Sequence, residues 1–216
     1  MKIRPEIPRR IIWQTSGSTG WTCWCLPTST ATTPTGWSSC CAAWRWGKWP
    51  SPGVEELGEL GEEIYSLTEE RSIPLRVIHT QTQYDLDSGG RITLYPPLGQ
   101  GESNEEGLSC LVSSGEFDTL ITGDMGQDVE QILLSRSQLP QVEVLVAGHH
   151  GSAGATSQAL LDQVQPLFAL ISVGENNTYG HPAQETLERL AGCGAMIYRT
   201  DLYGSVTIRW DGETKT

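Results

Sequence analysis

The chain has 216 residues, enough for one substantial domain with its own core and too few for two comfortable ones. No apolar run approaches the roughly 20 residues that span a bilayer, and the N-terminus lacks the apolar core of a signal peptide, so we expect a soluble chain. The formal net charge of −12 offers no basic footprint for nucleic acid.

The first 50 residues have a different composition from the rest of the chain. They contain six bases and one acid, whereas the remaining residues contain eight bases and 25 acids. Seven of the eight tryptophans and four of the six cysteines also fall in this stretch, which has one leucine and no valine. Its cysteines lack the paired spacing of a zinc knuckle. We therefore divide the chain into an atypical segment, 1–52, which we expect to be incomplete or disordered, and a domain, 53–216.

From residue 54 the pattern becomes that of an α/β protein. A helix is predicted at 54–72, because its apolar residues repeat at helical spacing from Leu57 to Leu67, and Pro74 stops it. Two short β-rich runs follow, at 74–80 and 91–97, with the turn DSGG between them. Residues 107–124 predict two strands joined at Ser114 and Gly115, and a helix covers 127–138.

The remaining elements alternate between strands and helices, which predicts a layered α/β domain. The last run of this series, GSVTIRW, is predicted to be a strand, and the helix PAQETLERLAG is predicted to begin at Pro182. In chain order the predicted elements are a strand at 142–147, a helix at 156–164, a strand at 167–173, a helix at 182–192, and strands at 195–200 and 204–210.

Polar residues that suit a metal or catalytic site lie where the predicted strands end. Asp124 closes FDTLITGD, and His149 and His150 follow the strand VEVLVA in the loop GHHGS. His181 lies before Pro182 and can face the same rim. An aspartate after Thr-Gly is also a common turn residue, and a histidine before a helix is often a cap. Two histidines flanked by glycines have little packing purpose, whereas His79 in RVIHT is interpreted as structural.

The segments TGD, VEVLVAGHHGS, ISVGENNTYGHP and YRTDLYGSVTI, in this order, resemble the metallo-β-lactamase-fold domain of the ComEC family of DNA-internalisation proteins. The resemblance runs from about residue 53 to residue 210. It implies an αββα four-layer sandwich that binds one or two divalent metal ions, zinc or manganese, at one sheet edge. It also implies DNA or another phosphodiester as substrate, and attachment to a membrane channel on the extracytoplasmic side in full-length relatives.

The same resemblance assigns roles to individual residues. Asp124 would bridge the metal ions, and a histidine of GHHGS, His149 by preference or His150, would be a ligand. Asp124, His149 and His181 would form the catalytic set. The substrate rim and the residues that support it would comprise Asn104, Ser152, Tyr179 and His181.

The family's other metal motif, H-x-H-x-D-H, is absent, because residues 1–50 contain no histidine. The threonines of PTSTATTPTGW suggest why. Each threonine codon begins with AC, so in a displaced frame each threonine becomes NAC, which encodes only His, Asp, Asn or Tyr. Threonines 28, 30, 32, 33 and 35 then fall on the His, His, Asp, His and Asn of H-x-H-x-D-H-x-N-G. We therefore predict that this segment is written out of frame, and a nucleotide sequence without histidine codons there would contradict the prediction.

Three functional hypotheses follow. The first is a metal-dependent hydrolase of the ComEC type that cleaves phosphodiesters. The second is an inactive fragment, since Asp124 and His149 supply too few ligands for two metal ions. The third is a hydrolase of the same superfamily with another substrate, such as a thioester or a β-lactam.

Overall fold

The computed structural model describes residues 11–12, 24–25, 49–52, 65–66, 68–86, 89–99 and 107–210. Most of the predicted helix at 54–72, the threonines of PTSTATTPTGW and Asn104 lie outside the described residues. Of that predicted helix, residues 65–66 and 68–70 are helical, before Pro74.

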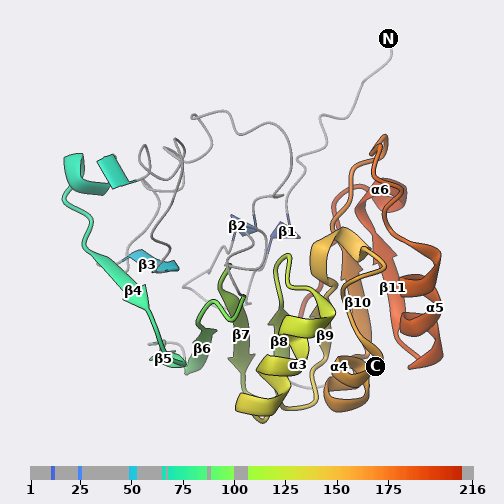
Figure 1. Ribbon diagram of the computed structural model, residues 1–216, viewed down its shortest axis with the longest axis horizontal. Helices are drawn as coiled ribbons and strands as arrows, with labels where there is room; N and C mark the ends of the chain where they lie inside the picture. Colours follow the sequence, from blue (N-terminus) through green and yellow to red (C-terminus); the bar gives the residue numbers. More distant parts are fainter. Residues whose placement is uncertain are drawn as a thin grey trace.

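A seven-stranded mixed sheet forms the centre of the described structure (Figure 1). This confirms the α/β class predicted from the sequence. The strand order is β11-β10-β9-β8-β7-β6-β5. The strands are β5 (Thr82–Asp85), β6 (Gly90–Tyr95), β7 (Ser109–Ser114), β8 (Phe117–Ile121), β9 (Val144–Val146), β10 (Phe168–Ile171) and β11 (Met196–Arg199).

The sheet has two halves with different strand directions. Strands β8, β9, β10 and β11 are mutually parallel, and helices connect them. Strands β5, β6, β7 and β8 are antiparallel neighbours. The turn between β7 and β8 contains Gly115, where the backbone has φ +61°. Because parallel strands all end at the same edge, the connections after β8, β9, β10 and β11 meet there.

Three helices cover one face of the sheet, namely α3 (Gln127–Arg136), α4 (Gln158–Val164) and α5 (Gln184–Gly192) (Figure 1). Alternate strand residues such as Leu120 and Leu145 pack against Leu133 and Leu161 in the main core. The hydroxyl of Ser157 accepts a hydrogen bond from the Leu160 amide and caps α4. The described sheet and its helices thus form one sheet layer and one helical layer.

The opposite face has a much smaller core. Val144, Val146 and Leu170 are buried there, and Val206 and Ile208 of the C-terminal segment pack against them. The predicted strand at 204–210 is wrong, because residues 206–210 join no ladder. The short helix α6 (Thr200–Tyr203) ends β11 and turns the chain onto this face.

Three further details differ from the sequence prediction. The run at 74–80 contains β4 (Leu75–Ile78), which pairs with β3 (Trp49–Pro52) and not with the main sheet. Strand β5 was not predicted, because its residues TQYD are polar and lie at the sheet edge. Helix α5 begins at Gln184 rather than at Pro182, since the chain first packs across Gly151.

Two small strand pairs complete the described backbone. Strand β1 (Ile11–Ile12) is antiparallel to β2 (Trp24–Cys25), and β3 is parallel to β4. None of the described helices is both long and apolar enough to cross a bilayer.

Candidate functional site at the edge of the parallel strands

The predicted site residues collect at the edge where the parallel strands end. Asp124 follows β8 in the turn Thr-Gly-Asp, and His149 and His150 follow β9. His181 lies at the end of the loop that follows β10. Because β8, β9 and β10 are adjacent in the sheet, these residues approach one another although more than 50 positions separate Asp124 from His181.

The GHHGS motif forms a tight turn, η1 (Gly148–Gly151), in which both histidines have positive φ, +46° and +56°. The His149 amide donates to the Gly123 carbonyl at 2.9 Å, which ties this turn to the Thr-Gly-Asp turn. A Cβ on Gly148 would lie 3.0 Å from the buried Thr122 hydroxyl, so glycine permits the close approach. Left-handed backbone outside glycine is uncommon and is typical of functional turns.

The two histidine rings have different partners. Nδ1 of His150 donates to the Ser172 carbonyl at 2.6 Å, at the end of β10. This contact sets the tautomer and leaves Nε2 as the acceptor nitrogen. The ring of His149 lies edge-on to that of His181, with centroids 5.8 Å apart, and 6.3 Å from that of His150.

The pKa of His181 is lowered from its ordinary value. Burial is the largest cause, the charges of His149 and His150 act in the same direction, and Asp124 opposes them. The imidazole of His181 is therefore neutral at neutral pH and can accept a proton. Asp124 is thus close enough to His181 to influence its charge.

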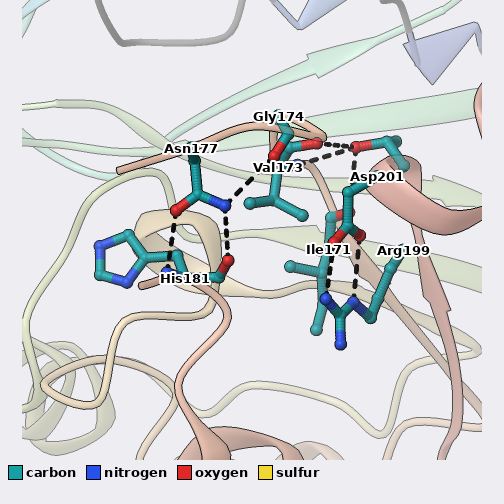
Figure 2. Close-up of polar contacts among 8 residues, drawn as sticks. Ile171, Val173, Gly174, Asn177, His181, Arg199 and Asp201 are labelled. Carbon is teal, nitrogen blue, oxygen red and sulfur yellow. Dashed lines mark hydrogen bonds and ion pairs between the residues drawn. The ribbon is translucent and has the colours of Figure 1, made fainter. Parts of the chain in front are cut away.

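The side chain of Asn177 holds His181 in place (Figure 2). Its amide nitrogen donates to the His181 carbonyl at 2.7 Å and to the Gly174 carbonyl at 3.1 Å, and its oxygen accepts from the His181 amide at 3.0 Å. Thr200, which follows β11, donates to the Val173 carbonyl and accepts from the Val173 amide, both at 2.8 Å. Hydrogen bonds therefore fix both ends of the loop between Val173 and His181. Asn177 was not predicted, although an asparagine within GENNTYGHP is a recognisable loop-closing residue.

The loop that carries His181 also packs directly on the GHHGS turn. A Cβ on Gly151, which has φ +80°, would lie 2.6 Å from the Pro182 Cβ. The Ala183 amide donates to the Gly151 carbonyl at 2.8 Å. The Thr186 hydroxyl donates to the Ser152 carbonyl at 2.7 Å. Ser152, predicted to support the rim, therefore acts through its backbone as an anchor for α5.

A buried carboxylate anchors residues 153–157, the segment that directly follows GHHGS. Glu130 is fully buried and accepts from the Thr156 and Ser157 amides at 2.6 and 2.7 Å. Arg189 donates to three carbonyls of the same segment, those of Ala153, Ala155 and Thr156. Glu130 was not predicted, although its position three residues before Leu133 places it on the apolar face of α3.

Burial raises the pKa of the Glu130 carboxyl, and its hydrogen bonds with Ser157 and Thr156, together with Arg189, oppose that shift only in part. Glu130 and Arg189 thus join α3 and α5 to the loop between the histidine turn and α4. The position of the histidine turn is therefore set by two helices as well as by β9.

The described residues do not by themselves fit a divalent metal ion. Among them, no group of three or more His, Cys, Asp or Glu side chains is placed to hold one. The ligands predicted from the displaced frame, together with Asn104, lie outside the described residues. Within the described structure, the arrangement offers a proton acceptor at His181 and an anchored imidazole at His150.

Three curated relatives are similar to about half of this chain. They are ComE operon protein 3 of Bacillus subtilis (34% identical over 113 residues, 52% of this chain), competence protein ComA of Neisseria gonorrhoeae (35%, 51% of this chain) and Recombination protein 2 of Haemophilus influenzae (36%, 50% of this chain). The chain spans only 13–16% of the length of these relatives. No protein-family model matches the chain.

Two solved structures are similar to the described fold at low sequence identity. A variant of the β-hydroxylase CmlA has a TM-score of 0.44 at 11% identity, covering 74% of this chain and 37% of that one. A Thermotoga maritima protein, described as a zinc-dependent hydrolase of the metallo-β-lactamase superfamily, has a TM-score of 0.34 at 13% identity, covering 62% of this chain and 61% of that one. Both scores are below 0.5, so neither match assigns a ligand or a reaction to this chain.

Proposed function

Because the chain is related over about half of its length to competence proteins of the ComEC type, we propose that it is a metal-dependent hydrolase of phosphodiester bonds in DNA. The observation that supports the proposal is the contact between the rings of His149 and His181, at an edge of the sheet where Asp124 also follows a parallel strand. Imidazole and carboxylate groups suit zinc or manganese, which supply hydrolytic chemistry when bound.

The chain's own residues have separate roles in this proposal. His149 and Asp124 would supply part of the ligand set, which the described residues alone do not complete, and His150 is the other candidate ligand in the same turn. His181, whose lowered pKa favours the neutral imidazole, would act as a proton acceptor at the substrate rim. Asn104 and Ser152 would support this rim, as the resemblance implies.

Substrate binding would depend on local groups rather than on a general electrostatic field. The net charge of −12 repels a polyanion, so phosphates must be held at the site itself. Attachment to a membrane channel, on the extracytoplasmic side, is proposed for full-length relatives from the family resemblance alone.

A second candidate is a catalytically inactive chain. It is favoured by the finding that no group of three potential ligands is placed to hold a metal ion within the described residues. The out-of-frame segment predicted in residues 1–52 would have the same effect, because it would remove the first metal motif. A different substrate within the same superfamily remains a third candidate without a specific observation in its favour.

One assay separates the first two candidates. The purified full chain is incubated with a labelled single-stranded oligonucleotide, and Mn²⁺ or Zn²⁺ is titrated. The proposal predicts turnover that depends on the metal and falls at least about 100-fold in Asp124→Asn and in His149→Asn.

The matched control for this assay is Asp128→Asn, which makes the same change at an exposed position in the first turn of α3. It should retain wild-type turnover. If the wild-type chain shows no metal-dependent turnover, the inactive candidate replaces the proposal. If β-lactam or thioester is hydrolysed and the oligonucleotide is not, the substrate class is wrong.

A further inference from the structure

We propose that Tyr179 is a stacking platform for a nucleobase of the substrate, so that the site selects phosphodiesters that carry unpaired bases. This inference rests on the function proposed above and adds a specificity-determining residue to it. Tyr179 is 63% exposed, although its ring is stacked on that of His181 with centroids 6.1 Å apart and planes inclined by 16°. One face of the ring is therefore supported by the site while the side chain remains open to solvent.

The position of Tyr179 is set in advance by the loop around it. The three hydrogen bonds of the Asn177 amide close the loop between Gly174 and His181 (Figure 2). Pro182 packs on Gly151 directly beyond His181. A ring that is already ordered loses little conformational entropy when a ligand stacks on it, which favours binding.

Tyr179 is also placed at a useful distance from the predicted reaction centre. Its ring stacks on His181, and the ring of His181 meets that of His149, so the three rings form a continuous series from solvent to the histidine turn. A base held on Tyr179 would place the neighbouring phosphate toward His181 and His149.

The charges of this loop explain why an aromatic contact is needed. Residues 172–183 contain Glu175 and no lysine or arginine. The loop therefore has no cation with which to bind phosphate. Base stacking on an aromatic ring tolerates any sequence and does not depend on salt as phosphate contacts do. Tyrosine can supply such a platform in a chain with a net charge of −12.

The test compares two fluorescent probes of equal length, an oligothymidylate and an oligomer of abasic deoxyribose phosphates, by anisotropy with the full chain. The wild-type chain should bind the oligothymidylate more tightly. Tyr179→Ala should weaken that binding about 10-fold and leave the abasic oligomer unchanged, whereas Tyr179→Phe should retain wild-type affinity. Tyr203→Ala is the matched control, because Tyr203 is also 63% exposed but lies against Tyr198 and not against a histidine.

A second pair of variants tests the ordering of the loop. Asn177→Asp loses the donors to Gly174 and His181 carbonyls, so it should reduce the ring-current shift of the His181 protons in NMR spectra and weaken oligothymidylate binding several-fold. Asn176→Asp introduces the same charge at the exposed neighbouring position and should change neither. Equal effects of the two variants would assign the loss to charge and would overturn the role of Asn177.

The outcomes distinguish this inference from the proposed hydrolysis. Binding that depends on Tyr179 without any turnover supports the platform and contradicts the hydrolase. Turnover whose KM is unchanged in Tyr179→Ala supports the hydrolase and overturns the platform. Wild-type chain that does not discriminate between the two probes, including failure to bind either, also overturns the platform.

Discussion

The two halves of the central sheet differ in both burial and chemistry. In the parallel half, β9 is buried along its whole length, and every described residue of the candidate site follows β8, β9 or β10. In the antiparallel half, β5 alternates between half-buried and exposed residues and lies at the edge of the sheet. The site is therefore built on loops that connect parallel strands to helices. The antiparallel strands extend and support the sheet and carry no described site residue.

The largest difference in stability between the two halves is expected when the Glu130 carboxylate is removed. Glu130→Ala leaves the Thr156 and Ser157 amides buried without an acceptor, and each such group costs roughly 1–3 kcal/mol, so the free energy of unfolding should fall by about 4 kcal/mol. Glu116→Ala, at the exposed turn of the antiparallel hairpin, should change it by less than about 0.5 kcal/mol. Urea denaturation measures both. Similar losses in the two variants would break the comparison.

Glycine substitutions give the next largest contrast. Gly151→Ala places a Cβ 2.6 Å from the Pro182 Cβ at a residue with φ +80°, which should destabilise the chain by about 3 kcal/mol. Gly115→Ala also has positive φ, but no atom lies within 4 Å of the added Cβ, so only the backbone strain of about 1 kcal/mol is expected. The difference in urea midpoint between the two variants isolates the contact between the loops. A larger loss for Gly115→Ala would contradict it.

The pH dependence of stability provides a third contrast. Burial raises the folded-state pKa of Glu130 above the ordinary carboxyl value of 4.5, so the folded chain retains a proton that the unfolded chain has released. The contribution of Glu130 to stability is therefore present below pH 4.5 and is lost as pH rises through the raised folded pKa. The free energy of unfolding of the wild type, relative to Glu130→Gln, should therefore decline as the pH rises through this window. A difference that is flat or rises with pH would contradict the burial of this carboxylate.

The smallest effect is expected at the exposed end of the antiparallel half. Arg91 and Asp85 form an ion pair at 2.7 Å between β6 and β5, with side chains that are 51% and 77% exposed. Arg91→Ala should lower the free energy of unfolding by less than about 0.5 kcal/mol, and 1 M salt should remove the difference. A loss of unfolding free energy as large as that of Gly151→Ala would show that the antiparallel half contributes as much to stability as the parallel half.

The elements predicted correctly are those whose signal lies within one contiguous stretch. The hairpin of β7 and β8 has alternating apolar residues and a glycine turn, and α3 has helical spacing. Strand β5 was missed because its polar residues are specified by pairing with β6 rather than by their own pattern. The predicted strand at 204–210 has the right pattern, but among the described residues it finds packing partners and no ladder.

The same distinction holds within the candidate site. Asp124 and the two histidines could be selected from the sequence because each follows an apolar strand. Glu130 and Arg189 could not be assigned their roles, because their partners come from other segments; Glu130 contacts residues 26 and 27 positions away. The partners of Asn177 lie within its own loop, so its role was open to prediction. The assignments of metal ligands and catalytic residues stay predictions, since no measurement of binding or turnover bears on them.

The order of most elements, the chemistry available at the strand ends and the similarity of about half of the chain to competence proteins reside in contiguous motifs of the sequence. The different contacts of the two adjacent histidines follow only from the tertiary structure. His149 and His150 are neighbours in the chain, yet one ring meets His181 and the other is bound to Ser172. The reason lies in contacts between segments: Pro182 packs on Gly151 and brings His181 against the ring of His149, and the carbonyl at the end of β10 holds His150.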